Sequence, residues 1–147
     1  MLLAEAIAEE EYIEELIDKI NSYIEKLLIG SNKVLLEKKL KELDELYKRH
    51  QQYDITINRT ESQALVKMNE MELNLRDARV IKDSLYEKLF NFEAMLDKAL
   101  RANKPDDVVC IDVEVLMTDV EEMRRDIKTI ENKIQHAIWN TEVKIAV

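Results

Sequence analysis

Pairs of acidic residues at helical spacing are the side chains in this sequence that could hold a metal ion. The pairs are Glu11 with Glu14, Glu15 with Asp18, and Glu42 with Glu45. A separation of three residues places both carboxylates on one face of a helix. Facing helices offer such groups to magnesium in all-helical nucleotide pyrophosphatases. Because the sequence has 31 acidic residues, such pairs also arise by chance, and we predict solvated helix faces with no metal site.

The two histidines do not have the spacing of a di-iron site. Helical di-iron proteins place Glu three residues before His, whereas Tyr47 precedes His50 and Lys133 precedes His136 at that spacing. His50 lies near an apolar stripe, which predicts a partly buried histidine with a hydrogen-bond partner. Gly30 is the only glycine, so the sequence has no glycine-rich phosphate loop. We therefore expect a protein that is not an enzyme, with no catalytic residues and no cofactor.

Basic side chains form small clusters in a sequence whose net charge is −9. Arg76, Arg79 and Lys82 share one helix face. Other clusters are Arg124 with Arg125 and Arg101 with Lys104. Salt bridges to the surplus carboxylates are the simplest role, although symmetric copies of the chain could join such clusters into a pocket for an anion. The negative charge argues against nucleic acid as a partner, because that affinity comes from neutralising phosphates.

Trp139 is the only tryptophan, and Asn140 follows it. A lone tryptophan at a helix end most often packs as an anchor whose ring nitrogen finds an acceptor. A stacking platform for the ring of a ligand is the alternative. Cys110 is the only cysteine, which excludes a disulfide or a cysteine-based zinc site within one chain.

Four apolar stripes with helical spacing predict the elements that position these residues. The clearest stripe consists of Val113, Leu116, Val120, Met123, Ile127, Ile130, Ile134 and Ile138. The other stripes lie within residues 2–28, 36–57 and 75–99, and the last helix should end near residue 139. The pattern predicts an all-α fold in a single domain of residues 1–147. We expect about four long helices, arranged as two helical hairpins that assemble through their amphipathic faces.

The breaks between the stripes predict the connections. Residues 30–32 should end the first helix and cap the second, and Pro105 prevents the third helix from continuing. Residues 60–73 lose the helical period, and apolar residues alternate about Asn69 and Glu70. This pattern indicates a short β-hairpin or an irregular crossover. Between this break and the last helix lie residues that are β-branched or small, namely Val108, Val109, Cys110, Ile111 and Val113. We expect a brief extended segment there that pairs with the earlier one.

Short pieces of the sequence match a known family. They are Leu3-Ala4-Glu5-Ala6, Ile57-Asn58-Arg59-Thr60, Asp77-Ala78, Asp83, Asp112-Val113, Ile134-Gln135 and Trp139 or Asn140. With these pieces the chain resembles the septicolysin-like family of small helical bacterial and phage proteins. The family's acidic loop after the first helix is reduced to residues 30–32, and residues 106–109 replace its basic stretch.

The resemblance implies a helical fold that self-associates. It also implies a binding pocket near helix ends, drawing on the matching residues Asn58, Arg59, Thr60, Trp139 and Asn140. The family's cytolysin label implies no pore here, because no segment approaches the roughly 20 apolar residues that span a membrane. The start of the chain has no signal-peptide pattern. We therefore expect a cytoplasmic protein with no membrane partner.

Together these observations predict a noncatalytic, homo-oligomeric binding protein. Its specific form would be a phage anti-defence sponge that sequesters a small anionic nucleotide signal. The candidate ligand-binding residues are Asn58, Arg59, Thr60, Arg76, Arg79, Lys82, Trp139 and Asn140. A structural or partner-binding helical module without a small-molecule site is one alternative. A magnesium-dependent all-α nucleotide pyrophosphatase is the other.

Overall fold

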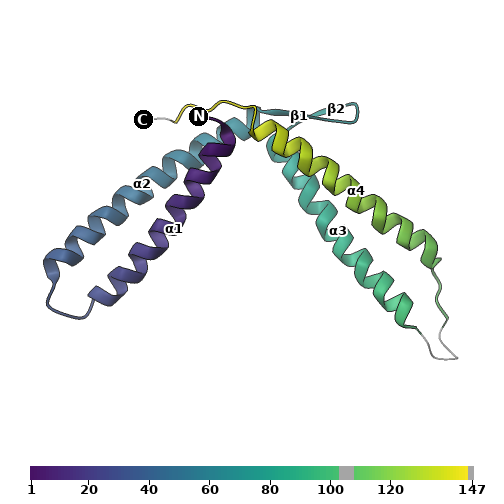
Figure 1. Cartoon of the computed structure of the whole chain (residues 1–147), viewed down its shortest axis with the longest axis horizontal. Coiled ribbons are helices and arrows are strands. Elements are labelled where there is room, and N and C mark those ends of the chain that lie inside the picture. Colours follow the sequence, from purple (N-terminus) through teal and green to yellow (C-terminus); the bar gives the residue numbers. More distant parts are fainter. Residues whose placement is uncertain (103–107, 146–147) are drawn as a thin grey trace. The chain divides into compact units, whose positions relative to one another are not determined.

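A computed structural model describes residues 1–102 and 108–145 of the chain. It confirms an all-α fold with one small sheet (Figure 1). The elements are α1 (Leu3–Leu27), α2 (Lys33–Gln63), β1 (Leu65–Met68), β2 (Met71–Asn74), α3 (Leu75–Arg101) and α4 (Val113–Ile138). Among the described residues, no helix combines the length and the apolar character needed to cross a membrane. The chain divides into two compact units, residues 1–64 with 138–145, and residues 65–137.

The first unit is built on the hairpin of α1 and α2. The buried face of α1 carries Ile13, Ile17 and Ile24, whose spacing keeps them on the side that packs against α2. Gly30 has a φ of 151°, a conformation that favours glycine, and it lies in the turn. The Asn32 side chain then accepts a hydrogen bond from the Leu35 backbone N–H at 3.2 Å, which caps α2. The predicted first hairpin is therefore confirmed.

The chain after α4 completes this unit by pairing with the chain before α1. The Leu3 N–H donates to the Thr141 carbonyl at 2.7 Å, and the Val143 N–H donates to the Met1 carbonyl at 2.9 Å. Val143 is buried. This pairing joins residues about 140 positions apart in the chain, and no sequence pattern indicated it.

The second unit contains α3 and α4, which lie side by side in Figure 1. The apolar stripe predicted for α4 is buried in this unit from Leu116 to Ile134, and its first member, Val113, is half-buried. Its buried members are Leu116, Val120, Met123, Ile127, Ile130 and Ile134. The two helices are also joined by the ion pair of Arg124 with Glu93 and by the hydrogen bond from the Tyr86 hydroxyl to Glu131.

The predicted β-hairpin is present, and two predictions around it are wrong. Strands β1 and β2 pair antiparallel, with Val66 opposite Leu73 and Met68 opposite Met71. Helix α2 continues past Thr60 to Gln63, because the Ala64 N–H still donates to the Thr60 carbonyl at 2.8 Å.

Residues 108–112 do not form the extended segment that we expected to pair with the hairpin, and they are exposed. They lead instead into α4, where Asp112 Oδ1 accepts hydrogen bonds from the N–H groups of Glu114 and Val115. Residues 103–107, including Pro105, lie outside the described part of the chain.

Candidate functional site

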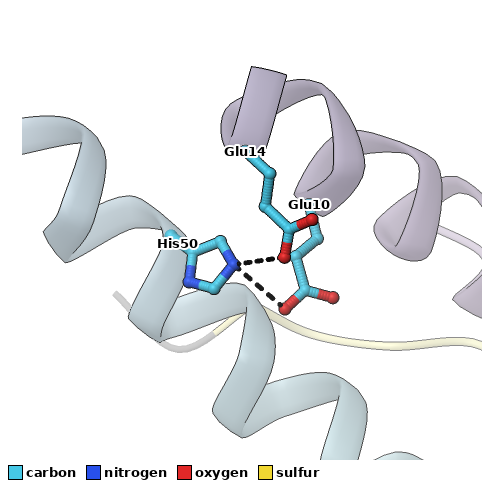
Figure 2. A group of neighbouring side chains, drawn as sticks. All are labelled: Glu10, Glu14 and His50. Carbon is cyan, nitrogen blue, oxygen red and sulfur yellow. Dashed lines mark hydrogen bonds and ion pairs between the residues drawn. The ribbon is translucent and has the colours of Figure 1, made fainter. Parts of the chain in front are cut away.

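A polar cluster lies between α1 and α2, where Glu10, Glu14 and His50 converge (Figure 2). Glu10 and Glu14 are one helical turn apart, so both carboxylates leave the same face of α1. His50 Nε2 lies 2.9 Å from Glu14 Oε1 and 3.6 Å from Glu10 Oε1. The prediction of a partly buried His50 with a hydrogen-bond partner is confirmed.

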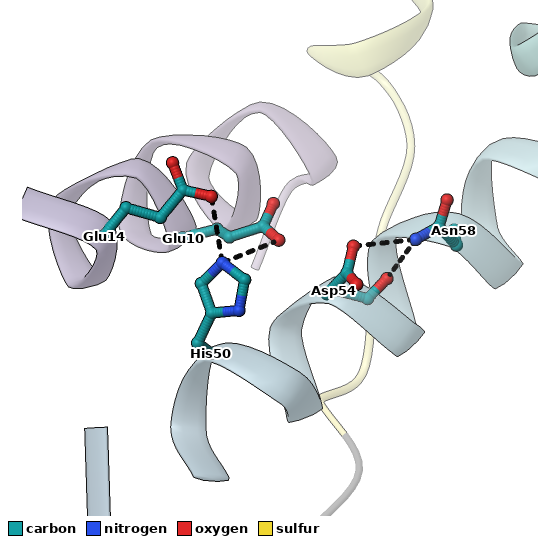
Figure 3. Close-up of polar contacts among 5 residues, drawn as sticks. All are labelled: Glu10, Glu14, His50, Asp54 and Asn58. Atoms are coloured by element: carbon teal, nitrogen blue, oxygen red, sulfur yellow. Dashed lines mark hydrogen bonds and ion pairs between the residues drawn. The ribbon is translucent and has the colours of Figure 1, made fainter. Parts of the chain in front are cut away.

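Asp54 and Asn58 extend the cluster along α2 (Figure 3). Asp54 comes one turn after His50, and its Oδ1 accepts a hydrogen bond from Asn58 Nδ2 at 2.8 Å. Burial raises the pKa of Glu10 above its ordinary value, and the Asp54 carboxylate adds to this rise, while His50 opposes it. The cluster therefore contains more negative charge than its single imidazole can balance.

The basic residues near the cluster are engaged elsewhere. Arg49 pairs with Glu9 at 3.3 Å, and Lys48 lies 3.5 Å from both Asp44 and Glu45. Within residues 1–102 and 108–145, no lysine or arginine forms an ion pair with Glu10, Glu14 or Asp54. The site can thus hold a proton or a cation, and no basic side chain competes for its carboxylates.

A second feature of the same hairpin is an apolar groove of about 470 Å³. Its floor consists of Leu16 and Ile20 from α1 and Leu46 from α2. The rim carries both signs of charge, and its charged residues are Lys38, Lys41, Glu42, Glu45 and Arg49. In shape and chemistry such a groove suits an amphipathic helix.

Of the acidic pairs singled out in the sequence, Glu42 with Glu45 forms ion pairs along α2. Glu42 lies 3.0 Å from Lys39, and Glu45 pairs with Lys48, as expected of a solvated helix face. Glu14 contacts His50 on the other helix. Its partner in the cluster is Glu10, which the three-residue spacing did not select.

The predicted residues Asn58, Arg59 and Thr60 lie within the last two turns of α2, in the first unit. The Asn58 amide is used by Asp54, and the Thr60 hydroxyl donates to the Thr56 carbonyl at 2.8 Å. The Arg59 side chain is exposed. Of the three, only Asn58 belongs to the polar cluster.

Trp139 and Asn140 follow α4 and also belong to the first unit. Trp139 is 55% exposed, so the expectation of a packed anchor is wrong. The stacking role of its ring stays a prediction.

The basic cluster Arg76, Arg79 and Lys82 lies in the first turns of α3, in the second unit. Within the described ranges, Arg76 and Lys82 form no ion pair. The predicted salt bridges to surplus carboxylates are present at Arg101, Arg124 and Arg125, since each pairs with a carboxylate. Arg76 and Lys82, together with the exposed Arg59 of α2, are therefore the members of the predicted site whose charge is available to an anion.

Comparison with known proteins gives a family and a fold. A model of a family of unknown function, DUF6847, matches residues 32–143. No curated protein matches the sequence. The chain is similar in structure to a functionally unknown conserved protein from Corynebacterium diphtheriae, with a TM-score of 0.83 and 21% sequence identity over 98% of this chain and 99% of the other. The resemblance to septicolysin-like proteins stays a prediction.

Proposed function

The chain belongs to the family of unknown function DUF6847, and we propose that it is a noncatalytic, homo-oligomeric binding protein that assembles through its helical hairpins. The observation that carries this proposal is the apolar groove between α1 and α2, whose floor is Leu16, Ile20 and Leu46. A hairpin of two helices buries only the stripe between them, so apolar side chains on its flanks stay in water until another helix covers them.

A second copy of the chain suits the groove in size. Helix α1 has 25 residues and is therefore about 37 Å long, and two helices side by side are about 20 Å wide. That face is of the order of the ~800 Å² that each partner contributes to a stable interface. Two such hairpins packed face to face would form a four-helix bundle.

The charged rim also favours a second copy. In a two-fold interface the same surface of both copies meets, so that if one residue contacts a second residue of the partner, the second also contacts the first. Ion pairs across such an interface therefore need both signs of charge on the same rim. Lys41 and Glu45 are one turn apart on α2, so an antiparallel copy of α2 would pair each with the other. The net charge of −9 makes two copies of the chain repel each other. Paired positive and negative residues on the rim remove that repulsion at the groove.

The proposal is tested by the mass of the protein in solution, measured by light scattering during gel filtration. Ile20→Glu puts a charge on the groove floor, and we expect it to weaken self-association at least tenfold. Val34→Glu is the control, because Val34 is 80% exposed and lies outside the groove. Circular dichroism verifies that both variants stay helical. A wild-type protein that is monomeric at about 100 µM would contradict the proposal, since that corresponds to an association free energy weaker than about −5.5 kcal/mol.

The bound molecule that we propose is a small anion of the nucleotide type, as the sequence suggested. Its support is Arg76 and Lys82, two cations six residues apart in α3 that form no ion pair with a described carboxylate. Native mass spectrometry of the gently purified protein is the test. Extra mass of one nucleotide-sized ligand per chain or per interface supports sequestration, and its loss in Arg76→Gln but not in Arg125→Gln would locate the site. A ligand-free oligomer would favour the structural or partner-binding module.

A further inference from the structure

The ligand atoms of Glu10, Glu14 and His50 lie within 4.8 Å of one another and come from two different helices (Figure 2). A tetrahedral zinc site with bonds of about 2.0–2.1 Å separates its ligand atoms by about 3.3 Å. The separations from His50 Nε2 are 2.9 Å to Glu14 and 3.6 Å to Glu10. Both distances from His50 therefore lie within a few tenths of an ångström of that value, and the Glu10 and Glu14 oxygens lie within 4.8 Å of each other. We propose that Glu10, Glu14 and His50 bind one divalent transition-metal ion.

The surroundings of these three side chains support the assignment. Asp54, one turn beyond His50, adds a third carboxylate to the cluster, and the hydrogen bond from Asn58 at 2.8 Å holds it in orientation (Figure 3). Asp54 also lies close enough to Glu10 to raise its pKa, and polar groups beside the ligands are typical of metal sites. The Glu10 side chain is 17% exposed and the His50 side chain 26% exposed, so both are partly withdrawn from water. A bound cation would balance the excess of negative charge.

The donor set selects the class of metal. An imidazole nitrogen together with carboxylate oxygens suits zinc and the neighbouring divalent transition metals. Magnesium and calcium prefer oxygen ligands alone, so the imidazole contributes little to their binding. Three protein ligands leave a fourth position for water, and the exposure of Glu14, 59%, keeps the ion accessible. The site is independent of the groove, because none of its three ligands lines the groove floor.

The competing explanation is that the cluster is complete as it stands, with Glu14 and His50 joined by a hydrogen bond and no metal bound. Zinc titration distinguishes the two. The protein should carry no histidine tag, should be stripped of metal, and should have Cys110→Ser in every variant, because Cys110 is an exposed thiol that binds zinc by itself. Calorimetry should then report one zinc ion per chain, with magnesium binding at least tenfold weaker.

Matched variants locate the ion. Glu14→Gln keeps the size of the side chain and should weaken zinc binding at least tenfold, whereas Glu11→Gln removes the same charge from a neighbouring exposed position and should leave it unchanged. His50→Ala should lose binding and His136→Ala, the other histidine of the chain, should retain it. In the NMR spectrum of the wild type, zinc should shift the ring signals of His50 and leave those of His136 in place.

Three results would overturn the proposal. They are no zinc binding by the wild type, equal losses in Glu14→Gln and Glu11→Gln, and zinc-induced shifts at His136 alone. If His50→Ala unfolds, as circular dichroism would reveal, the isosteric Glu14→Gln and the wild-type NMR titration still decide the outcome. None of these readouts depends on the oligomeric state, so failure of the metal site and failure of self-association are separable.

Discussion

Arg124 on α4 donates two hydrogen bonds to one carboxylate oxygen of Glu93 on α3, from Nε at 3.2 Å and from Nη2 at 2.7 Å. The two residues are 31 positions apart in the chain. Their side chains are 59% and 41% exposed, so water and salt reach the pair. It therefore contributes more to the alignment of α3 against α4 than to the total stability.

We expect a coupling free energy of about 0.2–1 kcal/mol between Arg124 and Glu93. A double-mutant cycle with Arg124→Met and Glu93→Gln, followed by urea unfolding, measures it. The coupling should shrink in about 1 M salt, because salt screens exposed charges. The pair of Arg125 and Glu121 within α4 is the reference, with about 0.3–0.5 kcal/mol expected. A coupling free energy above about 3 kcal/mol is typical of buried ion pairs and would contradict the exposure of these two side chains.

Ile130→Ala should lower the free energy of unfolding strongly. Ile130 is 1% exposed in the packed stripe of α4, and truncation of a buried isoleucine costs about 2–5 kcal/mol. Met117→Ala on the same helix removes a side chain that is 45% exposed and should change the free energy of unfolding by about 0.5 kcal/mol or less. Equal midpoints of urea unfolding for the two variants would contradict the burial of the stripe.

Asn69 connects β1 to β2 with a φ of 55°. Asparagine tolerates this left-handed conformation, glycine adopts it freely, and β-branched residues strongly disfavour it. Asn69→Gly should therefore leave the thermal midpoint unchanged or raise it slightly, and Asn69→Val should destabilise the protein by about 1–2 kcal/mol. If both variants unfold at the same temperature, the turn does not require a left-handed residue.

Glu10→Gln should stabilise the metal-free protein at neutral pH. The raised pKa of Glu10 means that the folded protein disfavours its charge. The folded state then holds more protons than the unfolded state between the ordinary pKa of 4.5 and the raised value. Wild-type stability therefore falls as the pH rises through that window.

The advantage of Glu10→Gln should consequently be complete above the raised pKa and should vanish below about pH 4.5. Thermal unfolding in a chelator at pH 4 and pH 7 measures it. Glu11→Gln, on the exposed side of the same turn, controls for the loss of one negative charge. An advantage of the Glu10 variant that is the same at both pH values would contradict the proposed cause. With zinc bound, the sign should reverse at pH 7, because the substitution removes a ligand.

The sequence by itself determined the type and approximate extent of the elements. Apolar spacing of three and four residues marked the buried face of α4, and Gly30 with Asn32 marked the first turn. The sequence also indicated the β-hairpin as one of two possibilities, because apolar residues alternate about Asn69 and Glu70. All of these signals are local: each depends on residues within a few positions of one another.

Only the tertiary structure decided which helix faces meet. Periodicity states which residues share a face of one helix, but it does not state how two helices are rotated or shifted against each other. His50 was therefore expected to have a partner, while Glu14, 36 residues away, could not be named as that partner. Glu10 and Asp54 were not predicted as site residues, because the sequence does not state which faces of α1 and α2 meet. Carboxylates at helical spacing are also common in an acidic chain, so their spacing did not single them out. The polar cluster exists because the packing of α1 on α2 aligns two pairs of residues, each one turn apart, and that packing is set by the buried apolar stripe between them.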